Sequence, residues 1–517
     1  MNKIWQDFTG GMNHLAVKSL LQPGEYHLLI NGRVRKHVVE NVRRPREMVG
    51  PVAEKYQCII AIDNLLVLVA DGYVYTKDCA ESTSAFVKNS DIRLDPGVDV
   101  IYGEVVPASN INYKRNVDSA VKIDPEVEYR GKLLNSPVGI VLQDGVSQPI
   151  IVTPDGNVRV TQNFNQWSTE NNREYVPIGK QMRWDGNTLF IVGDKKCFRS
   201  VSGRPLDFCI AVTKAGKKVE PEEDGGADAL SVGNVGNDIT CVASLNNQTR
   251  DVFISTRRGS IALSPSDLYF FGEPYYNVRT LVTGALNQNS FINILGDNVF
   301  VDIAGIKSFN AVESTLQASK YAEFNYAVSD MFVKQSDPAA ISFNTYAYFY
   351  IDTIYGKGIL VYDQITESFI SFDQFDELTG LKQFAVCDSL VDQSLVYITN
   401  NKIYEYEVGT KAAVELDVGQ LETPDAGKEI VPTHLFVTFD AEETGEVTVN
   451  LDTNGSLAST FSYTTDSTGI VVVPFGLHLK KRRGTNIGIR LSWNFAATLK
   501  SVQLSYDLDK TVVPLNP

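Results

Sequence analysis

The sequence predicts an all-β protein: a β-propeller of about 5–7 blades, with an N-terminal arm and a C-terminal β-sandwich. Three observations support this fold class. The chain has 25 Phe and 23 Tyr but only 5 Met, and aromatic residues favour strands. Short meanders of three strands recur along the chain, without amphipathic helices between them. With 43% hydrophobic and 21% charged residues over 517 positions, the chain has enough apolar surface for about two to four domains.

The first meander defines the repeating unit. Apolar runs at Cys58–Ala61 and Leu65–Ala70 are followed by Asp71-Gly72 and then by Tyr73–Tyr75. Asp-Gly supplies the positive φ angles that a tight hairpin turn requires. We therefore expect two antiparallel hairpins in succession.

The same unit recurs at blade-like spacing. Six further meanders lie at residues 139–160, 181–198, 239–262, 290–309, 346–372 and 384–406. A propeller closes these sheets into a ring and so protects their edges. Because the repeats carry no blade signature motif, a set of separate sandwiches remains the alternative.

Three domains are expected. They are an N-terminal arm (1–50), a propeller (51–427) with insertions near 77–136 and 214–228, and a C-terminal β-sandwich (428–517). In the first insertion, residues 98–107 alternate like a long strand, which is expected to be the outer strand of a blade or part of a projecting platform. Alternating runs in the last 80 residues fit a small sandwich.

Two basic clusters are candidate partner-binding sites. The arm carries eight basic and four acidic residues and so has a net charge of +4. Because the whole chain has a net charge of −15, the remaining residues have −19. This asymmetry predicts that the arm contacts an acidic neighbour. Solvated loop faces are the alternative for both clusters. The candidates are Arg33, Arg35, Lys36, Arg43, Arg44, Arg46, Lys480, Lys481, Arg482 and Arg483.

The sequence contains no recognisable catalyst, so we expect no enzymatic activity, no cofactor and no metal. The six cysteines form no C-x-x-C pair and are expected to be free thiols, mostly buried. The five histidines are scattered and are expected to be structural, and no G-x-S-x-G, P-loop or H-E-x-x-H motif occurs. A propeller glycosidase is the enzymatic alternative, because its carboxylates could converge at a central funnel.

The bulk properties also bear on location. The acidic chain lacks the positive charge of a protein that grips phosphates, although acidity also serves solubility. The first residues have no signal-peptide core, and no apolar stretch approaches the ~18 residues that span a bilayer. We expect a soluble protein that is made in a cytoplasm and does not contact membranes.

Several segments carry a family resemblance. They are Phe8–Asn13, Arg43-Arg44-Pro45, Ala70–Tyr75, Trp184–Val192, Gly203–Phe208, Leu295–Phe309 and Arg483–Leu491. In their order along the chain, these pieces resemble the tail hub or nozzle proteins of short-tailed bacteriophages. This family includes the packaged-DNA stabilisation proteins and the tail tubular protein B group.

The resemblance implies a structural component of the virion tail. Such a protein forms a ring of about six copies that continues the DNA channel, retains packaged DNA and contacts the portal or adaptor and other tail proteins. DNA would pass through the lumen without specific binding, which acidic walls favour because they do not hold phosphates. The chain is short relative to the long nozzle members, which puts a large platform domain in doubt. The alternatives are another virion binding module and a carbohydrate-active propeller enzyme.

Overall fold

A computed structural model of the chain reveals strands joined by turns and by short 3-10 helices. The structure describes residues 1–517 except 82–83, 108–138, 162–175, 186–187, 194–195, 201–204, 207, 209–227, 232–238, 246–251, 258, 264–277, 282, 310–323, 390–391, 425–427, 442–443, 466–469, 475–482 and 511–517. The 3-10 helices include η3 (Gln288–Ser290), η4 (Tyr326–Met331) and η5 (Asp376–Leu378). In the described part of the chain, no helix is long and apolar enough to cross a membrane.

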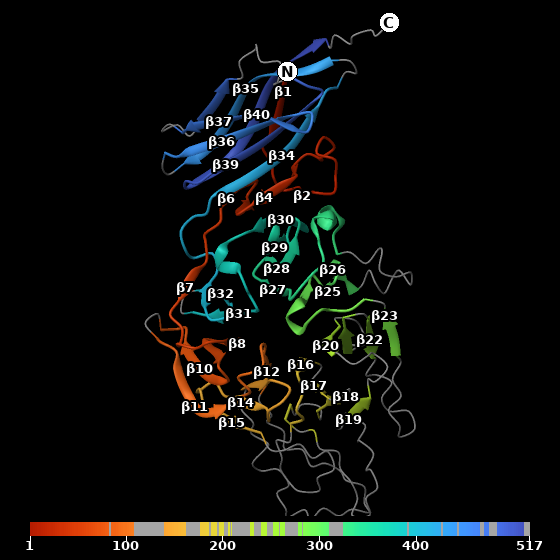
Figure 1. The fold of residues 1–517 in the computed structure, drawn as a ribbon, viewed down its shortest axis with the longest axis vertical. Helices are drawn as coiled ribbons and strands as arrows, with labels where there is room; N and C mark the ends of the chain where they lie inside the picture. Colours follow the sequence, from red (N-terminus) through yellow and green to blue (C-terminus); the bar gives the residue numbers. More distant parts are fainter. Residues whose placement is uncertain are drawn as a thin grey trace, which may run out of the picture.

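Seven small antiparallel sheets are arranged in a ring and form a β-propeller (Figure 1). Blade 1 contains β8 (Tyr56–Ile62), β9 (Leu65–Ala70), β10 (Tyr73–Asp78) and β11 (Val87–Arg93). Blade 2 contains β12 (Tyr102–Val106), β13 (Gly139–Gln143), β14 (Ile150–Val152) and β15 (Val158–Val160). Blade 3 contains β16 (Gln181–Asp185), β17 (Thr188–Gly193), β18 (Lys196–Arg199) and β19 (Asp228–Ser231). Blade 4 contains β20 (Ile239–Ser244), β21 (Val252–Thr256), β22 (Gly259–Leu263) and β23 (Val278–Leu281).

The last three blades differ in how they are completed. Blade 5 contains β24 (Phe291–Ile294), β25 (Asp297–Asp302) and β26 (Gly305–Ser308). Blade 6 contains β27 (Ala339–Phe343), β28 (Tyr346–Thr353), β29 (Gly356–Asp363) and β30 (Ser368–Asp373). Blade 7 contains β31 (Gln383–Asp388), β32 (Gln393–Ile398) and β33 (Ile403–Glu405), and its outer strand is β7 (Arg46–Met48) from the N-terminal segment. Because β7 precedes blade 1 in the chain, this pairing joins the two ends of the ring.

Local turn chemistry explains the hairpins. Asp71 and Gly72 have φ angles of 48° and 80°, as a hairpin turn with two positive φ values requires, and this confirms the predicted hairpin. Asn454 and Gly455 form the corresponding turn in the C-terminal domain. The assignment of residues 98–107 was wrong: their central part is β12, the inner strand of blade 2, rather than an outer strand or a platform.

Apolar side chains fill the spaces between the blades. Ile59 and Leu68 of blade 1 pack with Val396 and Ile398 of blade 7, and similar buried clusters lie between other neighbouring blades. Each such cluster removes apolar surface from water, which contributes roughly 25 cal/mol per Å² buried. The ring is therefore held together by face-to-face packing of its sheets.

A β-sandwich lies beside blade 6, and one of its two layers continues the sheet of that blade (Figure 1). One sheet contains β38 (Ile470–Pro474), β35 (Lys428–Ala441), β40 (Ala497–Lys510), β6 (Val38–Asn41) and β5 (Gly32–Arg35), with β1 (Asn2–Trp5) paired to β40. The other contains β4 (Leu28–Ile30), β34 (Val414–Glu422), β39 (Asn486–Trp493), β36 (Glu446–Thr453) and β37 (Ser456–Thr464). The C-terminal part of the sandwich thus begins at β34, before the predicted boundary at residue 428.

The N-terminal 50 residues do not form the separate arm that the sequence suggested. Their strands β1, β4, β5 and β6 belong to the sandwich, β7 closes the propeller, and β2 (Gly11–Met12) pairs with β3 (Glu25–Tyr26). Strands β1, β4, β6 and β7 pair with strands hundreds of residues away, as in the pairing of Asn2 with Ser505, whereas β5 pairs only with the neighbouring β6. Local sequence patterns carry no information about such distant pairing.

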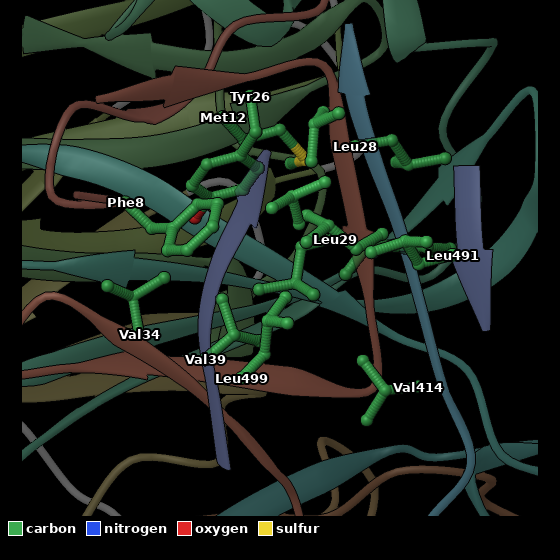
Figure 2. Packing of buried hydrophobic residues seen from close by; sticks show 14 of the residues in the cluster. Phe8, Met12, Tyr26, Leu28, Leu29, Val34, Val39, Val414, Leu491 and Leu499 are labelled. Atoms are coloured by element: carbon green, nitrogen blue, oxygen red, sulfur yellow. The ribbon is translucent and has the colours of Figure 1, made fainter. Parts of the chain in front are cut away.

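Strand β4 makes the two domains continuous. It pairs with β34 of the sandwich on one side, and Ile30 lies opposite Phe372 of β30 in blade 6 on the other. Leu28, Leu29 and neighbouring residues fill a core that extends from the sandwich into blades 5 and 6 (Figure 2). The propeller and the sandwich therefore share both a sheet and a core.

We predict that Leu29→Ala destabilises both domains together. Leu29 is fully buried in the shared core, and a Leu→Ala change at such a site costs about 2–5 kcal/mol. Leu15→Ala is the matched control, because Leu15 lies on the same segment but is 53% exposed. Chemical denaturation should give a single transition, shifted by Leu29→Ala and unchanged by Leu15→Ala. Loss of the sandwich alone, with an unshifted propeller transition, would contradict a shared core.

Candidate functional site: the funnel of the propeller

A cavity of about 1290 Å³ opens on the face of the propeller where the inner strands begin. Its walls are the segments that lead into the inner strands, such as residues 98–102, 178–181 and 379–382. The turns that follow the second strands also contribute, including residues 144–146 and Asn400. The funnel is thus built from loops of several blades, positioned by a rigid ring of strands.

Polar side chains bridge the propeller axis beneath this cavity. Tyr102 of blade 2 lies near the backbone of Gln288 in η3, which precedes blade 5 on the other side of the ring. Asn289 accepts a hydrogen bond from the Gln383 amide of blade 7 at 3.2 Å. Burial raises the pKa of the Tyr102 phenol well above its usual range, so the phenol stays neutral. Groups from different sides of the ring therefore meet beside the funnel.

The same side chains satisfy backbone groups on the inner strands. Gln383 accepts from the N–H of Ile59 in blade 1 at 2.9 Å. Gln288 both accepts from and donates to the backbone of Val242 in blade 4, at 2.9 and 2.8 Å. Unpaired backbone groups inside a protein are costly, so these contacts fix the blades relative to one another.

Both charge signs occur at the funnel. Four cations (Lys180, Arg257, Lys357 and Lys382) and three carboxylates (Asp99, Asp144 and Asp337) line it. Lys382 is 9% exposed and donates to Asp99 at 2.9 Å. Within the described residues, neither Lys180 nor Arg257 has a carboxylate partner. The funnel therefore offers positive charge within an acidic chain.

Asp144 is a structural carboxylate. It accepts from the backbone N–H groups of Asp95, Val146 and Ser147 at 2.6–2.8 Å. Although burial acts in the opposite direction, these hydrogen bonds hold the pKa of Asp144 below its usual value. The general acid of a glycosidase needs a raised pKa, which this carboxyl group does not have.

Arg33 was wrongly predicted to be a partner-binding residue, because it is 1% exposed. Its guanidinium pairs with both oxygens of Asp373, at 2.8 and 2.5 Å, and with Glu407 at 2.5 Å. Ser371 and Tyr406 complete the set. These two carboxylates raise the pKa of Arg33 against the effect of burial. Arg33 thus connects strand β5 of the sandwich to blades 6 and 7.

Other predicted arm residues also pair within the chain. Arg44 donates to Glu377 at 3.0 and 3.2 Å, and Arg46 donates to Glu405 at 2.6 Å. Arg35 lies 3.7 Å from Glu40 and 3.8 Å from Glu407. The acidic neighbour that the charge asymmetry predicted is, for these residues, the body of the same chain.

The remaining candidates are at the surface or outside the described residues. Lys36 is exposed in the turn between β5 and β6, and Arg43 is exposed and donates to the Gly409 carbonyl at 3.4 Å. Arg483 pairs with Asp509 at 3.2 Å. Lys480, Lys481 and Arg482 lie outside the described residues.

Two histidines stack at the junction between the domains. The rings of His14 and His27 have centroids 4.3 Å apart, and His14 contacts Asp330 at 2.9 Å and the Tyr355 hydroxyl at 2.7 Å. Burial lowers the pKa of His27 to about 3, and the charge of Lys18 adds to this effect. Among the described residues, no group of three His, Cys, Asp or Glu side chains is placed to hold a metal ion.

Sequence patterns did not identify the funnel. Its residues lie on loops from five or more strand pairs, and no short motif connects them. Repetition offered one signal: polar residues at the start of inner segments, such as Gln57, Gln181 and Gln383, mark the face on which the funnel opens.

Comparisons with known proteins indicate only distant structural similarity. The sequence matches no protein-family model and no curated protein. Of the solved structures, PorZ, a bacterial surface component of the type-IX secretion system of Porphyromonas gingivalis, is similar with 12% identity and a TM-score of 0.42. The match covers 90% of this chain but only 60% of PorZ.

Two glycoside hydrolases are also similar. An exo-β-1,3-galactanase from Phanerochaete chrysosporium has 9% identity and a TM-score of 0.24, with 90% of this chain and all of the enzyme covered. A family 43 arabinoxylan arabinofuranohydrolase from Bacillus subtilis has 8% identity and a TM-score of 0.21, covering 88% and 97% of the two chains. Similarities at this level carry no inference about activity.

We predict that Arg33→Ala is strongly destabilising. The change leaves Asp373 buried without its cation, which costs about 3–5 kcal/mol. Arg46→Ala is the control: Arg46 is 60% exposed, and an exposed ion pair contributes about 1 kcal/mol or less. Urea denaturation followed by tryptophan fluorescence should separate the two variants. Equal effects would show that Arg33 does not act as a buried clamp.

We also predict a pH dependence that originates at His27. The folded state keeps this imidazole neutral down to a pH of about 3, whereas the unfolded chain protonates it below about 6.5. Protons therefore favour the unfolded state in this window, and one such group lowers stability by up to about 1.4 kcal/mol per pH unit on acidification.

Denaturation midpoints at pH 7, 6 and 5 would measure this effect. The slope should decrease in His27→Gln and persist in His434→Gln, since His434 is exposed. An unchanged slope in His27→Gln would assign the pH dependence to other groups.

Proposed function

We propose that this chain is a structural, non-catalytic subunit of a bacteriophage tail hub or nozzle. In this role copies of the chain form a ring, of about six copies by resemblance, that continues the DNA channel and anchors other tail parts. The observation that carries the proposal is the continuous pairing of propeller and sandwich through β4, which supports a role in transmitting force between neighbouring proteins. The resemblance of the sequence segments supplies the tail context.

Rigidity is the property that such a subunit needs. Blade 6, β4 and β34 form one sheet, and a single core lies beneath it. A subunit that must hold neighbouring proteins under load gains from having no flexible linker between its domains.

In this proposal DNA does not pass along the axis of the propeller. Tyr102 of blade 2 and Gln288 before blade 5 approach each other across the ring, which leaves little room for a duplex. In a ring, the lumen would instead lie between copies. The overall charge of −15 supports a sliding surface, and the internal pairing of Arg33, Arg44 and Arg46 removes three of the cations that could hold phosphates.

The funnel favours a second candidate function. A cavity of about 1290 Å³ with both charges and polar side chains is suited to binding a glycan or a peptide. The chain would then be a binding module of a virion or a carbohydrate-active propeller. A glycan array and a hydrolysis screen test this alternative.

The decisive experiment measures the mass and shape of the purified chain. We predict closed rings with a central hole in negative stain and a light-scattering mass near six times 57.1 kDa. Because some rings close only on a neighbouring protein, the same measurement is repeated with the portal and adaptor of the parent phage. A monomer under both conditions, together with glycan hydrolysis, would overturn the hub proposal. An acidic lumen in the resulting map supports it, and a basic lumen contradicts it.

A further inference from the structure

Two free thiols, one from the first blade in the sequence and one from the last, lie next to each other. Cys79 follows β10 in blade 1, and Cys387 lies on β31 in blade 7, yet their thiol groups lie next to each other. Both residues contact the same carbonyl group: the Cys79 N–H donates to Asn64 O at 2.8 Å, and the Cys387 Sγ lies 3.8 Å from that oxygen. Cys79 also packs against the buried cluster that contains Cys387.

The meeting point lies on the seam where the ring closes. Blades 1 and 7 are the first and the last to be made, and Asp388 donates its N–H to Asp63 O across the same seam at 3.1 Å. The outer closure consists of three residue pairs between β7 and β33. A covalent bond between Cys79 and Cys387 would therefore act directly on ring closure.

The two thiols have different environments. Cys79 is partly exposed, whereas Cys387 is buried. The neighbouring thiol of Cys387 lowers the pKa of Cys79, and the nearby charge of Lys77 adds to this effect. The neighbouring thiol of Cys79, together with burial, raises the pKa of Cys387. An accessible thiol with a lowered pKa is the one that reacts first in thiol–disulfide exchange.

We propose that Cys79 and Cys387 form a disulfide by exchange with a small-molecule disulfide such as oxidised glutathione, and that this bond locks the propeller closed. The inference concerns the propeller itself and does not depend on a role in a phage tail. Reducing cytoplasm keeps the pair as thiols, and an oxidising exterior converts it to the disulfide.

The exchange proceeds in two balanced steps. The Cys79 thiolate attacks one sulfur of oxidised glutathione and forms a mixed disulfide, and the first glutathione leaves as a thiolate and takes up a proton. Cys387 then loses its proton to solvent, attacks the Cys79 sulfur and releases the second glutathione. Two protein thiols are oxidised and one small disulfide is reduced to two thiols.

The bond should stabilise the fold measurably. It closes a loop from residue 79 to residue 387, a separation of 308 positions, and so restricts the unfolded chain. For a chain of this size the expected rise in melting temperature is about 2–5 °C.

The test compares the full chain in oxidised and in reduced glutathione. Peptide mass mapping without reduction should find Cys79 joined to Cys387, and the melting temperature should rise in the oxidised sample. Cys79→Ala and Cys387→Ala should each abolish the rise. Cys58→Ala, which removes a buried thiol of blade 1, should retain it.

Several outcomes would overturn the proposal. They are free thiols at both positions after oxidation, a persistent glutathione adduct on Cys79, a disulfide between copies, or a Cys79–Cys387 bond that leaves the melting temperature unchanged. If Cys387→Ala folds poorly, Cys79→Ala and Cys79→Ser still decide the question, because Cys79 is only partly buried.

Discussion

The buried ion pair between Arg33 and Asp373 is the contact on which the relation between the two domains depends. Removing both charges from water is expensive, and the cost is offset only when geometry and hydrogen bonding are nearly complete. Here two nitrogens of one guanidinium meet both oxygens of Asp373, and Glu407, Ser371 and Tyr406 supply further contacts, while the buried Nε has no partner. Since these contacts require one arrangement of the two domains, they fix the orientation of the sandwich against blades 6 and 7. The apolar core in Figure 2 supplies the stability, and the ion pair supplies the specificity.

Buried polar groups are also paired within the propeller. Inner strands expose backbone groups toward the axis, and glutamine and asparagine side chains from other blades satisfy them. These side chains hold the blades in register across the ring. The funnel lies on one face of the ring, so a ligand that binds there would contact the loops that lead into the inner strands.

Local chemistry made part of this structure predictable. Asp71-Gly72 indicated a hairpin because only certain residues adopt its φ angles, and the recurring meanders indicated a propeller of about 5–7 blades, of which the structure has seven. Arg33 was misassigned because a cation in a short segment carries no sign of the distant Asp373 that buries it. The segment around β12 was misplaced for a similar reason: alternation identifies a strand but not its position in a sheet. The funnel could not be predicted, because its side chains converge only after the ring closes.

The pairing of the first strand with the last has a consequence for synthesis on the ribosome. The N-terminal amine of Met1 donates to the carbonyl of Tyr506 at 2.7 Å, and β1 lies along β40. At a translation rate of about 5–20 residues per second, β40 is synthesised roughly 25–100 s after β1. Until then β1 has a free edge, and free strand edges are templates for aggregation. The strands of the propeller blades end at Glu405, so the ring can close before β40 is translated, whereas the sandwich stays incomplete until β40 pairs with β1, β6 and β35.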